Sequence, residues 1–160
     1  MKKTILCRMP DGTSATLTMK EANEIIRNKG LAPGGDAQAF HTQNVLRRIK
    51  KYMPFLSGAL YKITQIQTDI RRPEIITDAP QAKYLFRGKV MIDPKINAAG
   101  FMTPEGWRSR KGSVKVMTSR NLVYTKTKNP MAGPRWDRAL SAAEGKAMAA
   151  DLQRYMARKG

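Results

Sequence analysis

Apolar residues recur with a helical period in the first half of the chain. Val45, Ile49 and Tyr52 follow one another at spacings of three and four residues, which places their side chains on one face of a helix. Glycines precede this segment, and Pro54 follows it with a ring that cannot continue a helix. The pattern predicts an amphipathic helix over residues 36–52.

A second helical pattern occupies the C-terminal part of the sequence. One face is marked at helical spacing by Trp136, Leu140, Ala143, Met148, Leu152 and Tyr155 or Met156. Pro134 suits the first turn because its φ angle is already helical. We expect a helix over residues 134–157.

A third, shorter helix is predicted before these two. Thr18 and Glu21 have the spacing of a capping box, and the helix should end near Lys29 with Gly30 as its left-handed C-cap. Asp36 then serves as the N-cap of the first long helix, because its carboxylate can accept free backbone N–H groups.

Alternating apolar and polar residues predict strands between the helices. Residues 1–19 form a predicted hairpin around a Pro-Asp-Gly turn at residues 10–12, and Gly88 ends a short helical turn that starts near residue 80. The other predicted strands cover residues 59–68, 74–77, 89–92, 113–117 and 121–126. Prolines and glycines punctuate residues 93–112, a long loop that we expect to be functional or mobile.

These elements predict an α+β fold, with a small, mostly antiparallel sheet flanked by the two long helices. A chain of 160 residues is most simply one domain, here residues 20–160 with the hairpin as an N-terminal extension. The N-terminus begins like a signal peptide, but Arg8 and Pro10 interrupt its apolar run, so we expect a soluble protein.

Charge changes the picture, because 30 lysines and arginines oppose 12 acidic residues and give a net charge of +18. Such a field attracts nucleic acid, anionic membranes or acidic proteins. Residues 106–135 contain no acid, and Trp107 or Tyr124 could add base stacking. The candidate interface or DNA-facing residues are Arg47, Arg48, Arg108, Arg110, Lys111, Lys115, Arg120, Lys126 and Lys128. Phosphate contacts, docking on an acidic protein and a solvated surface remain three open interpretations.

Candidate chemistry is sparse. His41 is the only histidine and Cys7 the only cysteine, and neither belongs to a cluster with metal-ligand spacing. Acidic residues are scattered thinly, and there is no phosphate-binding glycine loop. We therefore expect a non-enzymatic protein without metal or cofactor, with His41 at a helix surface or core edge.

Four motif blocks in a fixed order carry a family resemblance. They are Pro-Gly-Gly-Asp-Ala-Gln at residues 33–38, Tyr-Met-Pro-Phe-Leu-Ser-Gly-Ala-Leu at 52–60, Ala-Lys-Tyr-Leu-Phe-Arg-Gly-Lys-Val-Met at 82–91, and Leu-Val-Tyr at 122–124 with Pro-Met-Ala-Gly-Pro-Arg-Trp at 130–136. This order resembles a minor capsid protein family of tailed bacteriophages over about residues 28–145. Leu56-Ser57 and Leu85-Phe86 depart from the family's usual Asp-Thr and Tyr-Tyr. The matching residues are Gly34, Gly35, Tyr52, Pro54, Gly58, Tyr84, Gly88, Lys89, Tyr124, Gly133 and Trp136.

The resemblance implies a structural virion protein of the head–tail neck, similar to tail-completion or connector proteins. It also implies a ring homo-oligomer, typically a hexamer, that contacts neighbouring neck proteins and the tail tube or terminator, after assembly in the host cytoplasm. Non-specific contact with packaged DNA would suit the basic surface. The alternative from charge alone is a sequence-independent nucleic-acid-binding module.

Overall fold

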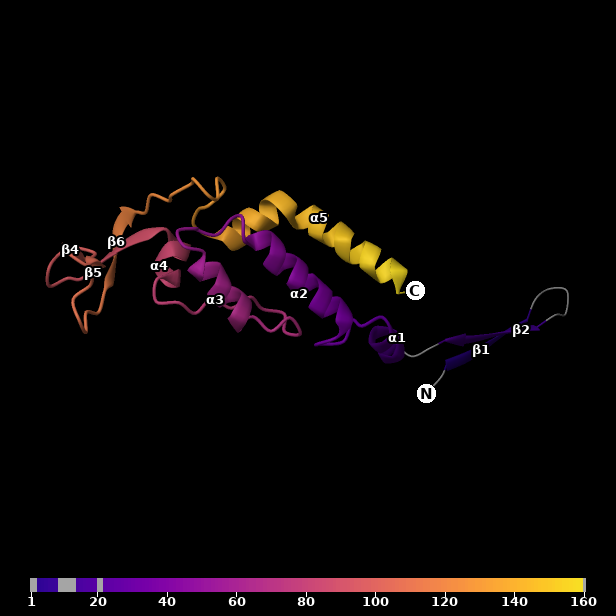
Figure 1. Ribbon diagram of the computed structural model, residues 1–160. Coiled ribbons are helices and arrows are strands. Elements are labelled where there is room, and N and C mark those ends of the chain that lie inside the picture. Colours follow the sequence, from indigo (N-terminus) through magenta and orange to yellow (C-terminus); the bar gives the residue numbers. More distant parts are fainter. Residues whose placement is uncertain (1–2, 9–13, 20–21, 160) are drawn as a thin grey trace. The chain divides into compact units, whose positions relative to one another are not determined.

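The chain forms helices and pairs of antiparallel strands in a computed structural model that describes residues 3–8, 14–19 and 22–159, with side chains from residue 23 onward (Figure 1). The helices of the described residues are α1 (Ala22–Asn28), α2 (Asp36–Ile49), α3 (Ala59–Gln67), α4 (Ala82–Arg87) and α5 (Trp136–Arg158). The strands are β1 (Lys3–Arg8), β2 (Ser14–Met19), β3 (Lys89–Ile92), β4 (Phe101–Thr103), β5 (Gly106–Arg108) and β6 (Val116–Asn121). The expected α+β class is confirmed, as are both long helices to within a few residues.

The described strands pair two by two, always antiparallel. β1 pairs with β2 in a register that runs from Lys3 opposite Met19 to Arg8 opposite Ser14, which confirms the N-terminal hairpin. Its predicted Pro-Asp-Gly turn lies outside the described residues. β3 pairs with β6, with a shift of register after Lys89, and β4 pairs with β5.

Contacts divide the chain into two compact units. Unit 1 comprises residues 1–44, 70–74 and 146–160, and unit 2 comprises residues 45–69 and 75–145. Each unit contains part of α2 and part of α5. The single-domain organisation stays a prediction.

Glycines set the entry to α2 in unit 1. Gly30 has a φ of 67°, and its N–H and that of Leu31 donate to Arg27 O and Ile26 O at 2.9 Å, the pattern of a Schellman C-cap. This confirms the cap predicted at Gly30. The expected capping role of Asp36 is wrong, because its carboxylate pairs with Lys159 and Arg71 while Ala37 N–H donates to the carbonyl of Gly30.

Side-chain contacts join α2 to α5 within unit 1. The rings of Phe40 and Tyr155 stack with centroids 4.2 Å apart, and Asn44 Nδ2 donates to Asp151 Oδ2 at 3.0 Å. Lys159 near the end of α5 pairs with Asp36 at the start of α2. The two helix segments are therefore held by stacking and polar contacts along their length.

The apolar stripes predicted from the sequence form the core of unit 2. Val45 is half-buried, and Ile49, Tyr52, Trp136 and Leu140 are each at most 5% exposed. The other buried apolar residues of this unit are Leu46, Met53, Leu60, Ala79, Ala82 and Ala132. The predicted stripes are therefore confirmed at these positions of both helices, whereas Ala143 of the C-terminal stripe is exposed.

The strand predicted at residues 59–68 is wrong, because α3 occupies this segment. Leu60, Thr64 and Thr68 are buried at four-residue spacing, which is a helical rather than a strand period. β-Branched residues are common here, and their strand preference is weaker than the burial pattern that decides the structure. Pro54 and Gly58 consequently lead into a helix, with Gly58 as its N-cap at a φ of 80°.

The strand predicted at residues 74–77 is also absent from the described structure. The backbone of Ile76 in this segment, and that of Asp78 directly after it, bond to side chains at the C-terminal end of α3 instead of to a neighbouring strand. Ile76 N–H donates to Thr68 Oγ1 at 3.1 Å, and Asp78 N–H donates to Gln67 Oε1 at 2.6 Å. Helix side chains therefore replace the sheet ladder.

The two strands predicted at residues 113–117 and 121–126 are wrong, because one strand, β6, runs through residues 118–121, where a turn between them was expected. Side-chain bonds hold it against β3. Thr118 Oγ1 donates to Val90 O at 2.8 Å, and Lys89 Nζ donates to Asn121 Oδ1 at 2.7 Å.

The long loop predicted at residues 93–112 contains the β4–β5 hairpin. Asp93 at its base is 1% exposed and accepts hydrogen bonds from Arg110 Nε at 2.8 Å and Nη2 at 3.2 Å. Lys95 N–H donates to the same carboxylate at 2.9 Å. We call this arrangement the Asp93–Arg110 clasp; it lowers the pKa of Asp93, mainly through the hydrogen bonds from Arg110.

Candidate interaction surfaces

Three of the four motif blocks meet around Gly88 in unit 2. Gly88 has a φ of 71°, and a Cβ atom there would lie 2.8 Å from Pro134 and 3.3 Å from the hydroxyl of Tyr124. The Tyr124 hydroxyl donates to Leu85 O, the carbonyl three residues before Gly88. Only glycine fits both the backbone conformation and the space. We call this contact region the motif junction.

Two further residues of the last block, Arg135 and Trp136, add contacts to the motif junction. Arg135 N–H donates to Phe86 O at 2.8 Å, and the ring of Trp136 meets that of Phe86 edge-on with centroids 4.9 Å apart. Arg135 has a φ of 49°, and its guanidinium lies 5.0 Å from the Phe86 ring centre. Trp136 and Arg135 thus bracket one aromatic ring.

The block at residues 52–60 joins the same region through main-chain contacts. Gly133 N–H donates to Tyr52 O at 3.3 Å, and Asn129 Nδ2 donates to Lys50 O and Met53 O at 2.9 Å. The block therefore packs on the segment that leads into α5, although 76 residues separate Asn129 from Met53.

The remaining motif residues also have structural contacts. Tyr84 OH donates to Lys115 O at 2.8 Å, and Lys89 Nζ donates to Ser119 O at 3.2 Å. In unit 1, Arg71 donates to Gly34 O at 2.8 Å, and a Cβ at Gly35 would lie 2.5 Å from Gly30 O. The motif residues named in these four paragraphs therefore shape turns and hold segments together.

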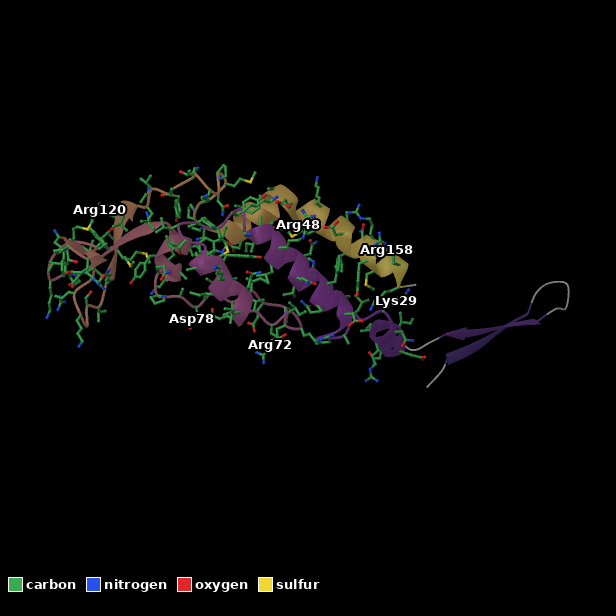
Figure 2. The ribbon with its side chains drawn as sticks, in the orientation of Figure 1. Lys29, Arg48, Arg72, Asp78, Arg120 and Arg158 are labelled. Atoms are coloured by element: carbon green, nitrogen blue, oxygen red, sulfur yellow. The ribbon has the colours of Figure 1, made fainter. Side chains whose placement is uncertain are left out.

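A basic pocket lies at the C-terminal end of α2 in unit 2. It has a volume of about 360 Å³ and is lined by Arg47, Arg48, Lys50, Lys51, Asn129 and Glu144. Figure 2 marks Arg48 among these side chains. Four cationic side chains against one carboxylate make this α2 basic pocket a candidate anion site.

Glu144 holds part of that positive charge in place. It is 12% exposed and accepts hydrogen bonds or ion pairs from Arg48, Lys51 and the Tyr52 hydroxyl, the last at 2.7 Å. The bonds from Lys51, Tyr52 and Arg48 lower the pKa of Glu144 from 4.5 to about 2. Burial and this carboxylate raise the pKa of Tyr52, so the phenol stays a donor. Arg48 and Lys51 are thus bound to the protein's own acid, and they are less able to bind a partner than their exposure suggests.

The other predicted basic residues separate into two groups. Arg110 and Lys115 bind inside unit 2: Arg110 holds Asp93, and Lys115 Nζ donates to Ala99 O and Ser109 Oγ at 2.6 Å. The remaining residues are exposed, and Figure 2 marks Arg120 on β6 as one of them. This exposed group is Arg108, Lys111, Arg120, Lys126 and Lys128.

The β4–β5 hairpin carries apolar residues to the surface. Met102 and Trp107 are cross-strand partners that are 71% and 60% exposed, and Phe101 opposite Arg108 is 44% exposed. Trp107 was expected at an interface because basic residues flank it in the sequence, whereas no role was expected for Asp93, whose buried carboxylate binds Arg110 at the base of the hairpin. The only available signal was an isolated acid before a basic stretch.

His41 lies half-buried on α2, at the core edge where we expected it, and its Nδ1 has no hydrogen-bond partner among the described residues. In the described part of the chain, no group of three His, Cys, Asp or Glu residues is arranged to hold a metal ion. No helix of that part has the length and apolar character needed to cross a membrane.

No protein-family model, no curated protein sequence and no solved structure matches this chain. The resemblance to the phage family therefore depends on the motif blocks alone.

Proposed function

We propose that the chain is a structural virion protein of a tailed bacteriophage, a part of the neck that joins the DNA-filled head to the tail. The observation that carries the proposal is the set of motif blocks in family order, three of which pack on one another around Gly88. Motif residues that form turns and packing contacts are consistent with a structural protein rather than an enzyme.

The partners proposed are further copies of the chain in a ring, neighbouring neck proteins and the tail tube or terminator. The β4–β5 hairpin is the surface we assign to such a neighbour, because Met102 and Trp107 expose apolar area that water solvates poorly. Aromatic residues of this kind are enriched among the residues that dominate binding energy.

Native mass spectrometry tests this proposal directly. The full chain is measured alone and with the proteins encoded by adjacent genes, and we expect a ring, typically of six copies, or a defined complex. A chain that stays monomeric and binds none of these proteins would contradict the proposal.

Trp107→Ala sharpens the test at the hairpin. We expect it to weaken assembly by about tenfold or more, because truncating a central aromatic anchor typically costs over 1 kcal/mol. Met131→Ala is the matched control, since Met131 is also exposed, at 56%, but lies outside the hairpin. Equal effects of the two substitutions would remove the hairpin from the interface.

A second candidate function is sequence-independent binding of nucleic acid, favoured by the net charge of +18 and the exposed basic group of unit 2. Binding to a duplex should weaken steeply with salt, by a slope of about −0.9 per phosphate contact in a plot of log K against log salt. Fluorescence anisotropy with two unrelated duplexes measures this slope and should give equal affinities.

Lys126→Glu with Lys128→Glu should make this slope shallower, whereas Lys146→Glu on α5 should not, although all three lysines are exposed. Absence of binding at low salt would eliminate this candidate function.

A further inference from the structure

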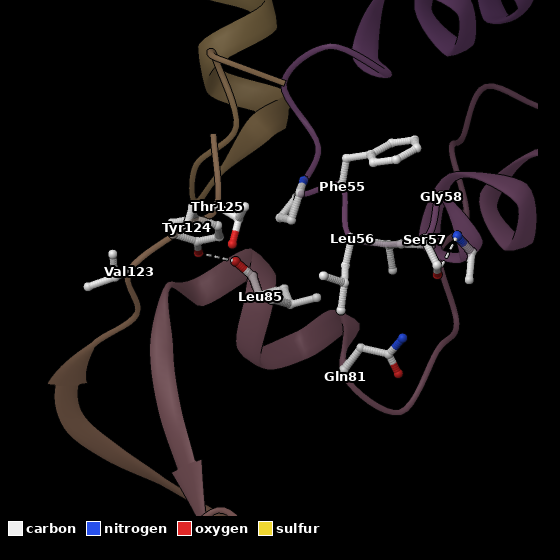
Figure 3. Close-up of a pocket in the computed structure, with 12 residues that line it drawn as sticks. Phe55, Leu56, Ser57, Gly58, Gln81, Leu85, Val123, Tyr124 and Thr125 are labelled. Carbon is white, nitrogen blue, oxygen red and sulfur yellow. Dashed lines mark hydrogen bonds between the residues drawn. The ribbon is translucent and has the colours of Figure 1, made fainter. Parts of the chain in front are cut away.

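An apolar groove opens in unit 2 beside the motif junction (Figure 3). It has a volume of about 350 Å³, a size that accepts one or two large apolar side chains. The segment before α3 lines one wall with Phe55 and Leu56, α4 contributes Leu85, and the segment after β6 contributes Val123 and Tyr124. No lining residue carries a charge.

Hydrogen bonds and close packing hold the walls of this groove. Tyr124 OH donates to the carbonyl of Leu85, a bond drawn in Figure 3, so the second and third walls are tied to each other. In the first wall, a Cβ at Gly58 would lie 3.1 Å from the Phe55 ring, which shows how closely that ring packs on the turn. Contacts within unit 2 therefore fix the walls of the groove.

Two apolar side chains at the groove are almost fully exposed. Leu56 is 90% exposed and Val123 is 96% exposed, and both line the groove. They are the two most exposed large hydrophobic residues among those described. Covering them would bury apolar surface without moving the core.

The backbone beside Val123 is also unsatisfied by protein partners. After Leu122 N–H donates to Gly88 O at 2.9 Å, residues 123–126 belong to no helix or strand. In the described part of the chain, their N–H and C=O groups bond to no other backbone group. Free backbone groups directly after a paired strand are the feature to which an extended peptide can add as a further strand.

Charged residues that flank the lining segments along the chain indicate the chemistry of such a peptide. The nearest ones are basic with the single exception of Asp78, and one of them, Lys51, already pairs with Glu144. The other basic residues are Lys62, Lys83, Arg87, Arg120 and Lys126. An occupant rich in carboxylates is therefore favoured over a basic one.

We propose that this groove binds an extended, acidic segment of another protein. The segment pairs its backbone with residues 123–126, places one large apolar side chain between Leu56, Leu85 and Val123, and directs carboxylates toward the surrounding basic residues. This assignment does not depend on the phage-neck function.

A second copy of this chain is a poor occupant. It carries the same net charge of +18, and no two of its 12 acidic residues stand closer than Glu21 and Glu24, three positions apart. At a spacing of at most four positions, the one segment with carboxylates on both sides of large apolar residues is Glu74-Ile-Ile-Thr-Asp78, and the backbone N–H groups of Ile76 and Asp78 already donate to Thr68 and Gln67.

A displayed library of random heptapeptides, selected on the intact protein at moderate salt, tests the proposal. We expect enrichment of peptides that combine a large apolar residue with flanking Asp or Glu. No enrichment, or enrichment of basic peptides, would overturn the assignment.

Variants of the groove locate the binding of an enriched peptide. Leu56→Asp and Val123→Asp should each weaken its binding by about tenfold or more, because both remove apolar contact and repel carboxylates. Ile66→Asp is the matched control, since Ile66 is 84% exposed on α3 and does not line the groove. Binding unchanged by the first two variants would overturn the proposal, as would self-association of the chain that Val123→Asp abolishes.

The backbone contact has its own test. The enriched peptide is synthesised with N-methyl groups on alternate residues, in both registers, which removes N–H donors and keeps every side chain. We expect one register to lose about tenfold or more in affinity and the other to lose less, because only alternate residues of an added strand face the edge. Equal affinity of all three peptides would exclude strand addition.

Discussion

Two regions of the molecule are stabilised by different kinds of contact: the motif junction within unit 2 and the α2–α5 pair within unit 1. In unit 2 the motif junction joins turns and segment ends through backbone groups, glycine positions and buried aromatic rings. In the α2–α5 pair of unit 1 the contacts join side chains on two helices, such as Phe40 with Tyr155. A turn that must fit its neighbour tolerates little change, whereas a helix surface can adjust its rotamers.

The carboxylates of the two units show the same contrast. Glu144 in unit 2 is 12% exposed and bonds to two cations and a phenol, whereas Asp36 in unit 1 pairs with two cations but is 52% exposed. Water screens the second cluster much more than the first. Similar pairs of residues therefore have unequal consequences for stability.

The largest expected effect is that of Gly88→Ala. The new methyl group would lie 2.8 Å from Pro134 at a φ of 71°, so the segment leading into α5 must move. We expect a loss of about 2–4 kcal/mol in the free energy of unfolding, measured with urea. Gly133→Ala is the control, because no heavy atom lies within 4 Å of its added Cβ. Equal losses for both variants would contradict the importance assigned to the motif junction.

A smaller effect is expected from Glu144→Gln, which should cost about 1.5–3 kcal/mol at neutral pH because hydrogen bonds to a charged group are lost. The pKa of this carboxyl is about 2 in the folded chain and 4.5 in the reference state. A depressed folded pKa gives stability that is present above 4.5 and is lost as pH falls toward 2. The difference between wild type and variant should therefore shrink over this interval.

Asp36→Asn is the matched control for that pH series. Its carboxyl also has a lowered pKa, mainly through the hydrogen bond from Lys159, but it is exposed to solvent. We expect a change too small to separate from wild type in the same denaturation experiment. A loss as large as that of Glu144→Gln would remove the contrast between the two clusters.

The smallest measurable effect is expected in unit 1, from Phe40→Leu. The substitution keeps an apolar side chain but removes the stacked ring pair with Tyr155, for which about 0.5–1.5 kcal/mol is typical beyond buried area. A double-mutant cycle with Tyr155→Leu isolates that coupling. No coupling energy in the cycle would show that the stacking contributes nothing of its own.

Predictions from the sequence were correct where the local geometry strongly favours one residue type. Gly30 and Gly88 adopt the left-handed conformation expected of helix C-caps, and Pro54 follows α2 as expected. Ile49, Trp136 and Leu140 are buried because their spacing leaves them on one helix face. These features depend on local geometry, which neighbouring residues reveal.

The wrong predictions have a common cause in tertiary contacts. Residues 74–77 were expected to form a strand, yet the side chain of Thr68 binds the backbone of Ile76, and Gln67 binds the backbone of Asp78 directly after the segment. Residues 118–121 were expected to turn, yet Lys89 and Val90 hold them as a strand. The residue pattern within either segment does not indicate these distant partners.

The candidate surfaces were predicted only in part, for the same reason. Arg48 and Arg110 were selected by charge, but Glu144 and Asp93 bind them. Leu56 and Val123 lie in two separate motif blocks of the sequence, and only the folded arrangement places them at one groove. Exposure of an apolar residue is a property of the fold.

The Asp93–Arg110 clasp has a consequence for how the hairpin meets a partner. It joins residues 17 positions apart, so the entropy cost of closing that loop is met when the chain folds. Binding then does not have to order the loop, and Met102 and Trp107 can keep more of their contact energy as affinity. Without the clasp, binding would have to order the loop, and the affinity of the hairpin for a partner would be lower.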